Sequence, residues 1–182
     1  EKEERYTSEI LAAYSHFLEP ADIPAATVET VQRCLLDLIA AVVAGAQCEP
    51  AFLSRQTVKR MMGDGASEIW FAGDSCRAAG AAFANSAAAS ALDLDDGHRA
   101  AGGHPGSAII PAVLAVAQEG SADWPAGLAP LVIGYEVGVR VSAARDFSAL
   151  DTFSTGRWSA FGVAAAAGRL RGLSISKTAE AI

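Results

Sequence analysis

The chain of 182 residues carries 14 Lys and Arg against 21 Asp and Glu, which gives a formal net charge of −7 at pH 7. This acidic balance argues against a protein that tracks nucleic-acid phosphates, because such proteins present a basic face. Apolar residues make up 51% of the chain and charged residues 19%, a composition typical of a globular protein. Alanine accounts for 40 residues, and because alanine favours helices and is depleted in strands, we expect a mostly helical domain.

The three cysteines fit neither a CxxC motif nor the spacing of a zinc or iron–sulfur site: Cys34, Cys48 and Cys76. An odd number of unclustered cysteines does not make a disulfide framework, so we expect a reduced, cytoplasmic setting. The longest apolar run covers residues 34–46, is interrupted by Asp37 and is too short to cross a membrane. We therefore expect neither a membrane nor a nucleic acid as a partner.

Both ends of the chain have the character of cuts in a longer sequence. Residues 1–5 are charged and lack the apolar stretch of a signal peptide, and residue 1 is not methionine. Residues 179–182 stop in the middle of a helical pattern. We expect residues 1–182 to form one incomplete N-terminal helical domain, with the rest of the protein beyond residue 182.

Apolar residues recur at steps of three and four along most of the chain, which is the spacing of one buried helix face. This period and the intervening Pro and Gly residues predict seven helices, over residues 7–18, 25–46, 50–62, 75–92, 107–119, 124–144 and 157–170. Asp123 and Pro125 supply the start of the sixth helix, and Ser174 or Ser176 caps a short eighth one. Only residues 67–72 have the composition of a strand. The predicted fold class is all-α.

The polar segment between two alanine-rich helices, residues 93–107, concentrates the reactive side chains of the chain. Within twelve residues it holds three carboxylates, two of the three histidines and an arginine: Asp93, Asp95, Asp96, His98, Arg99 and His104. Four glycines and a proline indicate a shaped loop, and reactive groups often lie on loops held by rigid elements. Ser107 begins the next helix, whose free backbone N–H groups can face an anion.

An imidazole takes up or releases a proton near neutral pH, and a neighbouring carboxylate fixes its orientation and tautomer. Asp93 or Asp96 beside His104 would form such an acid–base unit. In the alternative, structural interpretation, the aspartates cap turns and the helix start while the histidines bond to backbone carbonyls. The density of polar groups in one short loop favours the catalytic interpretation.

Two other chemistries fit the same residues. Asp93, Asp95, Asp96 and His98 could hold Mg²⁺ or Mn²⁺ through hard ligands. A DxD pair of nucleophile and acid, as in haloacid-dehalogenase-type phosphatases, should follow a buried strand, whereas residues 78–91 have helical spacing. A divalent-metal enzyme remains an alternative, and so does a non-catalytic helical interaction domain.

Four stretches, in the same order, resemble the MmgE/PrpD family, which includes 2-methylcitrate dehydratase, cis-aconitate decarboxylase and iminodisuccinate epimerase. The clearest is A-L-D-L-D-D at residues 91–96 followed by H-P-G-S at 104–107, which is similar to the family's A-L-D-F-D-D and H-P-G or H-P-S motifs. The others are C-L-L-D-L-I-A at 34–40, G-Y-E-V-G-V-R at 134–140 and A-F-G-V-A-A-A-A-G at 160–168. The resemblance covers essentially the whole chain.

The resemblance implies the helical domain of a two-domain enzyme, in which a smaller α+β domain closes over the site as a lid. It also implies a homodimer that uses no metal or organic cofactor and acts on a small di- or tricarboxylate. The implied enzyme is a lyase or isomerase that removes a proton next to a carboxylate, in dehydration, decarboxylation or epimerisation. Without the second domain, we expect this chain to be nearly inactive.

Residue by residue, Asp93 and His104 match the catalytic Asp and His of the family. Arg140 matches the arginine of the family's Tyr-Glu helix and is one candidate for binding substrate. The other candidates lie in or beside the loops that flank the motifs: Asp96, His98, Arg99, Ser154, Thr155 and Arg157. Arginines suit this role because they bind carboxylates in bidentate fashion.

Two departures from the family pattern bear on the reaction. The family often has a histidine shortly before the F-G-A helix, whereas this chain has Phe153 there. The first loop has Gly97-His98-Arg99 where many dehydratases have Thr-His or Thr-Trp-His. The missing histidine weakens the dehydratase and decarboxylase interpretations more than an epimerase-like one, which needs only removal and return of an α-proton. The family's catalytic lysines correspond to positions beyond residue 182.

Overall fold

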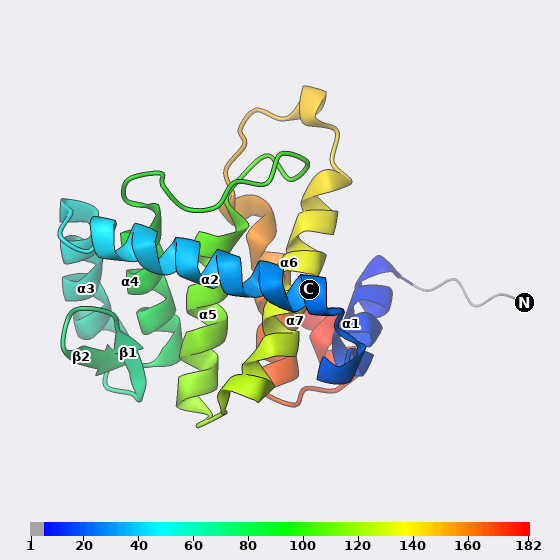
Figure 1. Ribbon diagram of the computed structural model, residues 1–182, viewed down its shortest axis with the longest axis horizontal. Coiled ribbons are helices and arrows are strands. Elements are labelled where there is room, and N and C mark those ends of the chain that lie inside the picture. The colour runs from blue at the N-terminus through cyan, green and yellow to red at the C-terminus, as the bar shows by residue number, and fades with distance from the viewer. Residues whose placement is uncertain (1–5) are drawn as a thin grey trace, which may run out of the picture.

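The computed structural model describes residues 6–182 and is all-α apart from one small hairpin, as predicted (Figure 1). The helices of the described part are α1 (Thr7–Phe17), α2 (Ala25–Gly45), α3 (Glu49–Met62), α4 (Ala78–Ser90), α5 (Pro105–Glu119), α6 (Trp124–Ala143), α7 (Gly156–Leu170) and α8 (Ile175–Ala181). The hairpin consists of β1 (Ser67–Ile69) and β2 (Asp74–Cys76), and two short 3-10 turns complete the chain, η1 (Pro20–Asp22) and η2 (Phe147–Ala149).

Helix α5 forms the centre of the domain. Most of its side chains are buried because its sequence is apolar on nearly every side, and Ile109, Ile110 and Val113 are at most 1% exposed. Helices α4, α6 and α7 pack against α5, and α2 crosses the front of this group (Figure 1). Helices α1 and α8 cover one end, while α3 and the hairpin cover the other. The loops that lead into α5 and α7 consequently lie at the same edge of the domain (Figure 1).

Small residues allow the helices to approach one another closely. A Cβ atom at Gly162 of α7 would collide with the carbonyl oxygen of Gly134 in α6. A Cβ atom at Gly45 of α2 would likewise collide with the carbonyl oxygen of Ala88 in α4. Backbone therefore packs directly on backbone at both crossings, and the small residues serve close packing as well as helix propensity.

Gly162→Ala is expected to lower the free energy of unfolding by about 1–3 kcal/mol, because the added methyl group forces α6 and α7 apart. Gly127→Ala in α6 is the matched control, since a Cβ atom there meets no atom within 4 Å. The control should raise the free energy of unfolding by roughly 0.5–1 kcal/mol through helix propensity. Urea unfolding followed by circular dichroism measures both, and equal effects of the two changes would contradict the close α6–α7 contact.

All eight predicted helices are present, with their ends shifted by a few residues. The predicted caps are also observed, because Asp123 accepts from the N–H of Ala126 and Ser174 from that of Lys177. The main error lies at residues 67–77, where the single predicted strand is a hairpin and α4 begins three residues later than expected. The hairpin turn requires left-handed backbone at Phe71, with φ of 58°, a conformation that an aromatic residue does not signal in the sequence.

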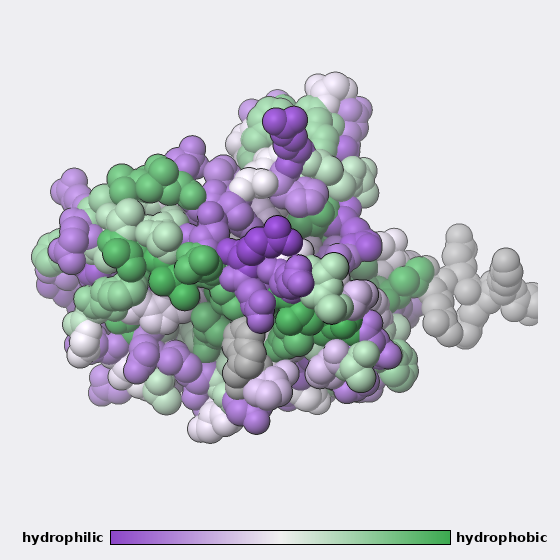
Figure 2. All heavy atoms as spheres, viewed as in Figure 1, coloured by the Kyte–Doolittle hydropathy of each residue, from purple (hydrophilic) through white to green (hydrophobic). Residues whose placement is uncertain are grey.

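Helices α2 and α3 carry an apolar outer surface. Figure 2 shows apolar side chains gathered over the C-terminal half of α2 and over α3. The exposed large residues on these two stretches include Leu36, Ile39, Val43, Phe52 and Leu53. Among residues 6–182, no single helix is both long and apolar enough to cross a membrane, and α2 and α3 meet that criterion only as a pair bent by 93°.

Candidate active site

A pocket of about 310 Å³ opens where the segments that lead into α5 and α7 meet. Four of the residues predicted from the sequence line it together, although they come from two distant parts of the chain: Asp93, His104, Ser154 and Thr155. Asp95 and four further serines also contribute to its wall: Ser86, Ser90, Ser107 and Ser159. The pocket thus combines acidic groups, one imidazole and many hydroxyl groups.

His104 lies immediately before α5, and its ring is fixed from one side. Its Nδ1 atom lies 3.0 Å from the backbone carbonyl oxygen of Asp95. Because a carbonyl oxygen can only accept, Nδ1 is the donor, and Nε2 of the neutral ring keeps a free lone pair. Nε2 lies 3.5 Å from Oδ1 of Asp93, and the side chain of His104 is 35% exposed. Nε2 is therefore the ring nitrogen without a backbone contact, and it lies at an accessible position in the pocket.

Asp95 is buried beside this ring. Its side chain is 1% exposed, and Oδ1 lies 3.6 Å from Nδ1 of His104. Neither carboxylate oxygen of Asp95 receives a hydrogen bond from the described residues. A carboxylate without donors is unfavourable in a protein interior, and such exceptions are associated with function. From the sequence, Asp95 is expected only as a possible metal ligand, because nothing in the sequence marks it as buried.

Asp93 occupies the more exposed side of the pocket. Its backbone has a φ of 56°, in the left-handed region that aspartate tolerates better than most residues. Its side chain is 86% exposed, with Oδ1 facing Nε2 of His104. The two carboxylates thus differ in environment, since Asp95 is removed from water and Asp93 remains in contact with it.

Hydroxyl groups and helix ends make up much of the remaining wall. Ser107 lies in the first turn of α5, while Ser154 and Thr155 directly precede α7. The hydroxyl oxygen of Thr155 accepts a hydrogen bond of 3.0 Å from the backbone N–H of His104, which joins the two helix starts. The first N–H groups of a helix lack intrahelical partners and carry the positive end of the helix dipole. Some of these N–H groups are already bonded, since Gly106 donates to Asp96 and Arg157 donates to the carbonyl of Ser154. The positive ends of the two helix dipoles still suit an anionic group of a ligand.

The cluster also has the spacing of a cation site, since ligand atoms of Asp93, Asp95 and His104 lie within 4.8 Å of one another. The two carboxylates, however, approach opposite nitrogens of the imidazole ring. Because the Asp95 carbonyl engages Nδ1, Nε2 is the ring nitrogen open to a metal ion, and the Asp95 carboxylate lies beside the other nitrogen. Asp96 and His98, the other ligands of the metal hypothesis, do not line this pocket. The geometry favours acid–base chemistry over metal ligation.

Sequence comparison assigns this helical domain to a known family. The profile described as the MmgE/PrpD N-terminal domain matches residues 9–182, nearly the whole chain. The chain belongs to the MmgE/PrpD family. The predicted resemblance is thereby confirmed, and the family is one of lyase-type enzymes.

A relative of this MmgE/PrpD domain is found in Aspergillus oryzae (strain ATCC 42149 / RIB 40). The protein, named cis-aconitate decarboxylase-like protein oryM, is 30% identical to this chain. The match covers 91% of this chain but only 36% of the relative. The chain thus spans about a third of the length of this curated relative.

Asp96 lies in the same loop as Asp93 and Asp95 but outside the pocket of this MmgE/PrpD domain. Its Oδ1 accepts from the backbone N–H of Gly106 at 2.7 Å, and its Oδ2 accepts from the hydroxyl of Tyr135 at 2.8 Å. Burial raises the pKa of the Asp96 carboxyl, and the two hydrogen bonds oppose that shift. The structure therefore gives Asp96 contacts within the protein at the place where we expected contact with substrate.

The cationic and imidazole candidates also lie outside the pocket. His98 bonds with the backbone of its own turn through its N–H and its Nδ1 atom, and Arg99 is exposed. Arg140 forms an ion pair with Glu136 on the same helix, and Arg157 is exposed at the start of α7. Within residues 6–182, no lysine or arginine lines the pocket.

Phe153 takes the position where MmgE/PrpD proteins often have a histidine. Its ring is exposed and stacks on that of Phe147, with centroids 5.9 Å apart and an interplanar angle of 12°. This position therefore contributes an aromatic contact within the segment between α6 and α7, and it offers no proton-transfer group.

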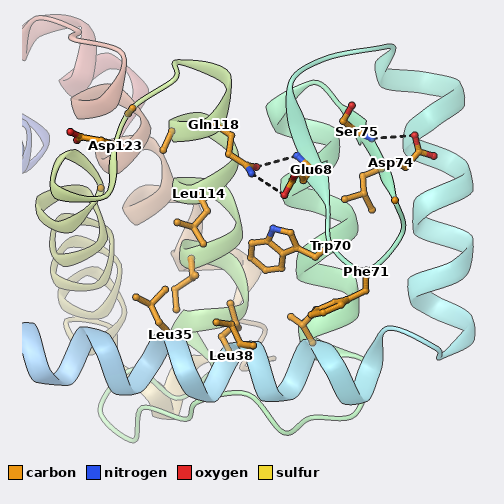
Figure 3. Close-up of a pocket in the computed structure, with 18 residues that line it drawn as sticks. Leu35, Leu38, Glu68, Trp70, Phe71, Asp74, Ser75, Leu114, Gln118 and Asp123 are labelled. Carbon is orange, nitrogen blue, oxygen red and sulfur yellow. Dashed lines mark hydrogen bonds between the residues drawn. The ribbon is translucent and has the colours of Figure 1, made fainter.

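A larger, more apolar groove of about 890 Å³ lies between α2, the hairpin and α5 (Figure 3). Leu35, Leu38 and Leu114 face Trp70 across it (Figure 3). Its polar residues serve the structure, as where Glu68 exchanges hydrogen bonds with Gln118. In the described part of the chain, no histidine lines this groove. The groove is therefore larger than the pocket at His104 but lacks an imidazole that could transfer a proton.

Proposed function

We propose that this chain is the helical domain of a lyase that acts on a small di- or tricarboxylate and moves a proton through Nε2 of His104. One observation carries the proposal: the Asp95 carbonyl engages Nδ1 of His104, and Nε2 faces the pocket with Oδ1 of Asp93 at 3.5 Å. The MmgE/PrpD family and the decarboxylase-like name of the relative support the reaction class. No metal or organic cofactor takes part in the proposed step.

The proton transfer serves either lyase reaction. In a dehydration, Nε2 removes a proton from carbon and the electron pair forms the double bond, while the departing hydroxyl group takes that proton back from the imidazolium and leaves as water. In a decarboxylation, the C–C bond breaks to release CO₂, and the electron pair left on the substrate takes up a proton from the imidazolium. In both, the buried carboxylate of Asp95 stabilises the ring when it carries a second proton, and Asp93 contacts Nε2 from the exposed side.

The substrate carboxylates require positive partners that the pocket itself lacks. The N-termini of α5 and α7, with Ser107, Ser154 and Thr155, supply donors for one carboxylate. Asp93 and Asp95 repel an anion, so this part alone binds it weakly. We propose that cationic groups beyond residue 182, in an α+β domain that closes over the pocket, complete the site of a homodimeric enzyme. The greater length of the relative supports this proposal.

The longer protein that includes this second domain is the right material for the test. Proton NMR with cis-aconitate, itaconate, citrate, 2-methylcitrate and iminodisuccinate should show loss of water or CO₂ from one of these substrates. Activity should persist in EDTA, whereas loss in EDTA and rescue by Mg²⁺ would favour the metal hypothesis. Epimerisation without loss of water or CO₂ would keep the role of His104 but change the reaction class. Silence across the panel with a folded protein would contradict the proposal.

A further inference from the structure

One carboxylate ties three separate segments of the domain together. Asp96 lies in the loop after α4, Gly106 in the first turn of α5 and Tyr135 in the middle of α6. Each oxygen of the Asp96 carboxylate accepts one hydrogen bond, from the Gly106 N–H at 2.7 Å and from the Tyr135 hydroxyl at 2.8 Å. Hydrogen bonds to an ionised acceptor are among the stronger ones in proteins, so this junction is rigid.

The junction is also closely packed. A Cβ atom at residue 106 would lie 2.5 Å from Oδ1 of Asp96 and 2.8 Å from the hydroxyl oxygen of Tyr135, so any other residue there would displace both groups. Burial raises the pKa of Tyr135, with a further contribution from the charge of Asp96. The phenol therefore keeps its proton and remains a donor to Asp96. The close approach of Asp96 and Tyr135 to residue 106 explains why the H-P-G motif has a glycine at this position.

The junction and the proposed catalytic groups share the same short stretches of backbone. Asp96 directly follows Asp95, and Gly106 lies two residues after His104. The hydrogen bond from Gly106 to Asp96 therefore runs beside the contact of 3.0 Å between the Asp95 carbonyl oxygen and Nδ1 of His104. Asp95 lines the pocket, whereas Asp96 does not. Loss of the hydrogen bond between Gly106 and Asp96 would therefore allow the contact between the Asp95 carbonyl oxygen and Nδ1 of His104 to lengthen.

We infer that Asp96 and Tyr135 are positioning residues, which hold the Asp95 carbonyl against Nδ1 of His104 and thereby keep Nε2 as the basic nitrogen. The inference rests on the proposed function for its catalytic consequence, but the ring geometry can be measured without any substrate. Tyr135 does not line the pocket and acts only through Asp96. A purely structural tyrosine would change stability and leave the tautomer of His104 as it is.

The test is ¹⁵N NMR of the histidine rings in the 182-residue chain, in the wild type and in Tyr135→Phe. We expect the proton of neutral His104 on Nδ1 in the wild type and a mixture of both tautomers in Tyr135→Phe. Tyr14→Phe is the matched control, because it removes a hydroxyl from α1, far along the chain from the loop, and should leave the His104 signals unchanged. Unchanged His104 signals in folded Tyr135→Phe would overturn the inference, as would a wild-type ring protonated on Nε2.

Asp96→Asn is the second variant, and it covers the case in which Tyr135→Phe does not fold. An amide keeps the shape of the side chain but can accept only one of the two hydrogen bonds well, so the same shift toward mixed tautomers is expected. Because the two residues act through one hydrogen bond, the double variant should add little to either single change. A double effect equal to the sum of the single effects would contradict a shared mechanism.

In the longer protein, Tyr135→Phe should lower kcat by roughly tenfold to a hundredfold and change KM by less than about twofold, since the reacting group is misplaced while the substrate donors remain. A tautomer shift in a protein with no activity on any carboxylate would leave the positioning role intact and contradict the proposed function. A normal tautomer with reduced kcat would contradict the positioning role alone. The two proposals therefore fail in different ways.

Discussion

His104→Gln is expected to lower kcat in the longer protein by about 10²–10⁴-fold, the range typical of a lost general acid or base. Glutamine approximates the size of histidine and can still donate to the Asp95 carbonyl, but it cannot exchange a proton with substrate. The domain should remain folded, because His104 is 35% exposed and its N–H contact with Thr155 involves only the backbone of residue 104.

His98→Gln is the matched control for this change. The two histidines lie six positions apart in the same loop, but His98 is turned toward the backbone of its own turn and lies outside the pocket. Its replacement should change kcat by less than about threefold, which is small beside the general acid–base contribution. A larger loss of kcat in His98→Gln than in His104→Gln would contradict the assignment of the proton-transfer group.

Asp95→Asn is expected to have opposite effects on activity and on stability. Activity should fall by about a hundredfold or more, because the protonated ring of His104 loses its buried negative partner. The free energy of unfolding should rise by about 1–3 kcal/mol, since a neutral amide of the same shape replaces a carboxylate that is 1% exposed and has no donors.

Asp93→Asn provides the comparison for the stability measurement. Its carboxylate is 86% exposed and therefore remains hydrated in the folded state, so the substitution should leave stability nearly unchanged. Urea unfolding at neutral pH measures both variants, and steady-state kinetics of the longer protein gives the change in kcat. A marked loss of stability in Asp95→Asn would mean that its carboxylate is already paired in the resting protein, which would contradict the predicted gain in stability.

The helices could be predicted from the sequence because their signals are local. Apolar spacing, Pro and Gly residues and the caps at Asp123 and Ser174 act within a few residues of one another. The hairpin was missed because its turn depends on left-handed backbone at Phe71, which the residue type disfavours. There, contacts made by the whole domain outweigh the local preference.

The pocket could be predicted only in part. The loop motif and the segment before α7 indicated Asp93, His104, Ser154 and Thr155, and the fold brings these four together. The sequence could not show that Asp95 lines the pocket while Asp96 bonds to Gly106 and Tyr135. Two adjacent aspartates do not indicate which way each side chain points. Hydropathy would predict that Leu94 is buried and Asp95 exposed, whereas Leu94 is 58% exposed and Asp95 is buried.

The arginines failed to join the pocket for a related reason. Arg99 and Arg157 lie next to the motifs in sequence, but both are exposed. A long charged side chain keeps its charged end in solvent unless a partner group binds it. Arg140 satisfies its charge on its own helix through Glu136. Sequence proximity therefore identified the loops that form the pocket better than it identified the side chains that enter it.

The role of His104 in proton transfer can be measured as transfer of solvent deuterium to carbon by the longer protein in D₂O, followed by proton NMR with the reactive carboxylate. We expect deuterium in the wild type and in His98→Gln, at the carbon that exchanges its proton, and none above background in His104→Gln. Equal deuterium incorporation by wild type and His104→Gln would contradict the claim that Nε2 of His104 carries the proton.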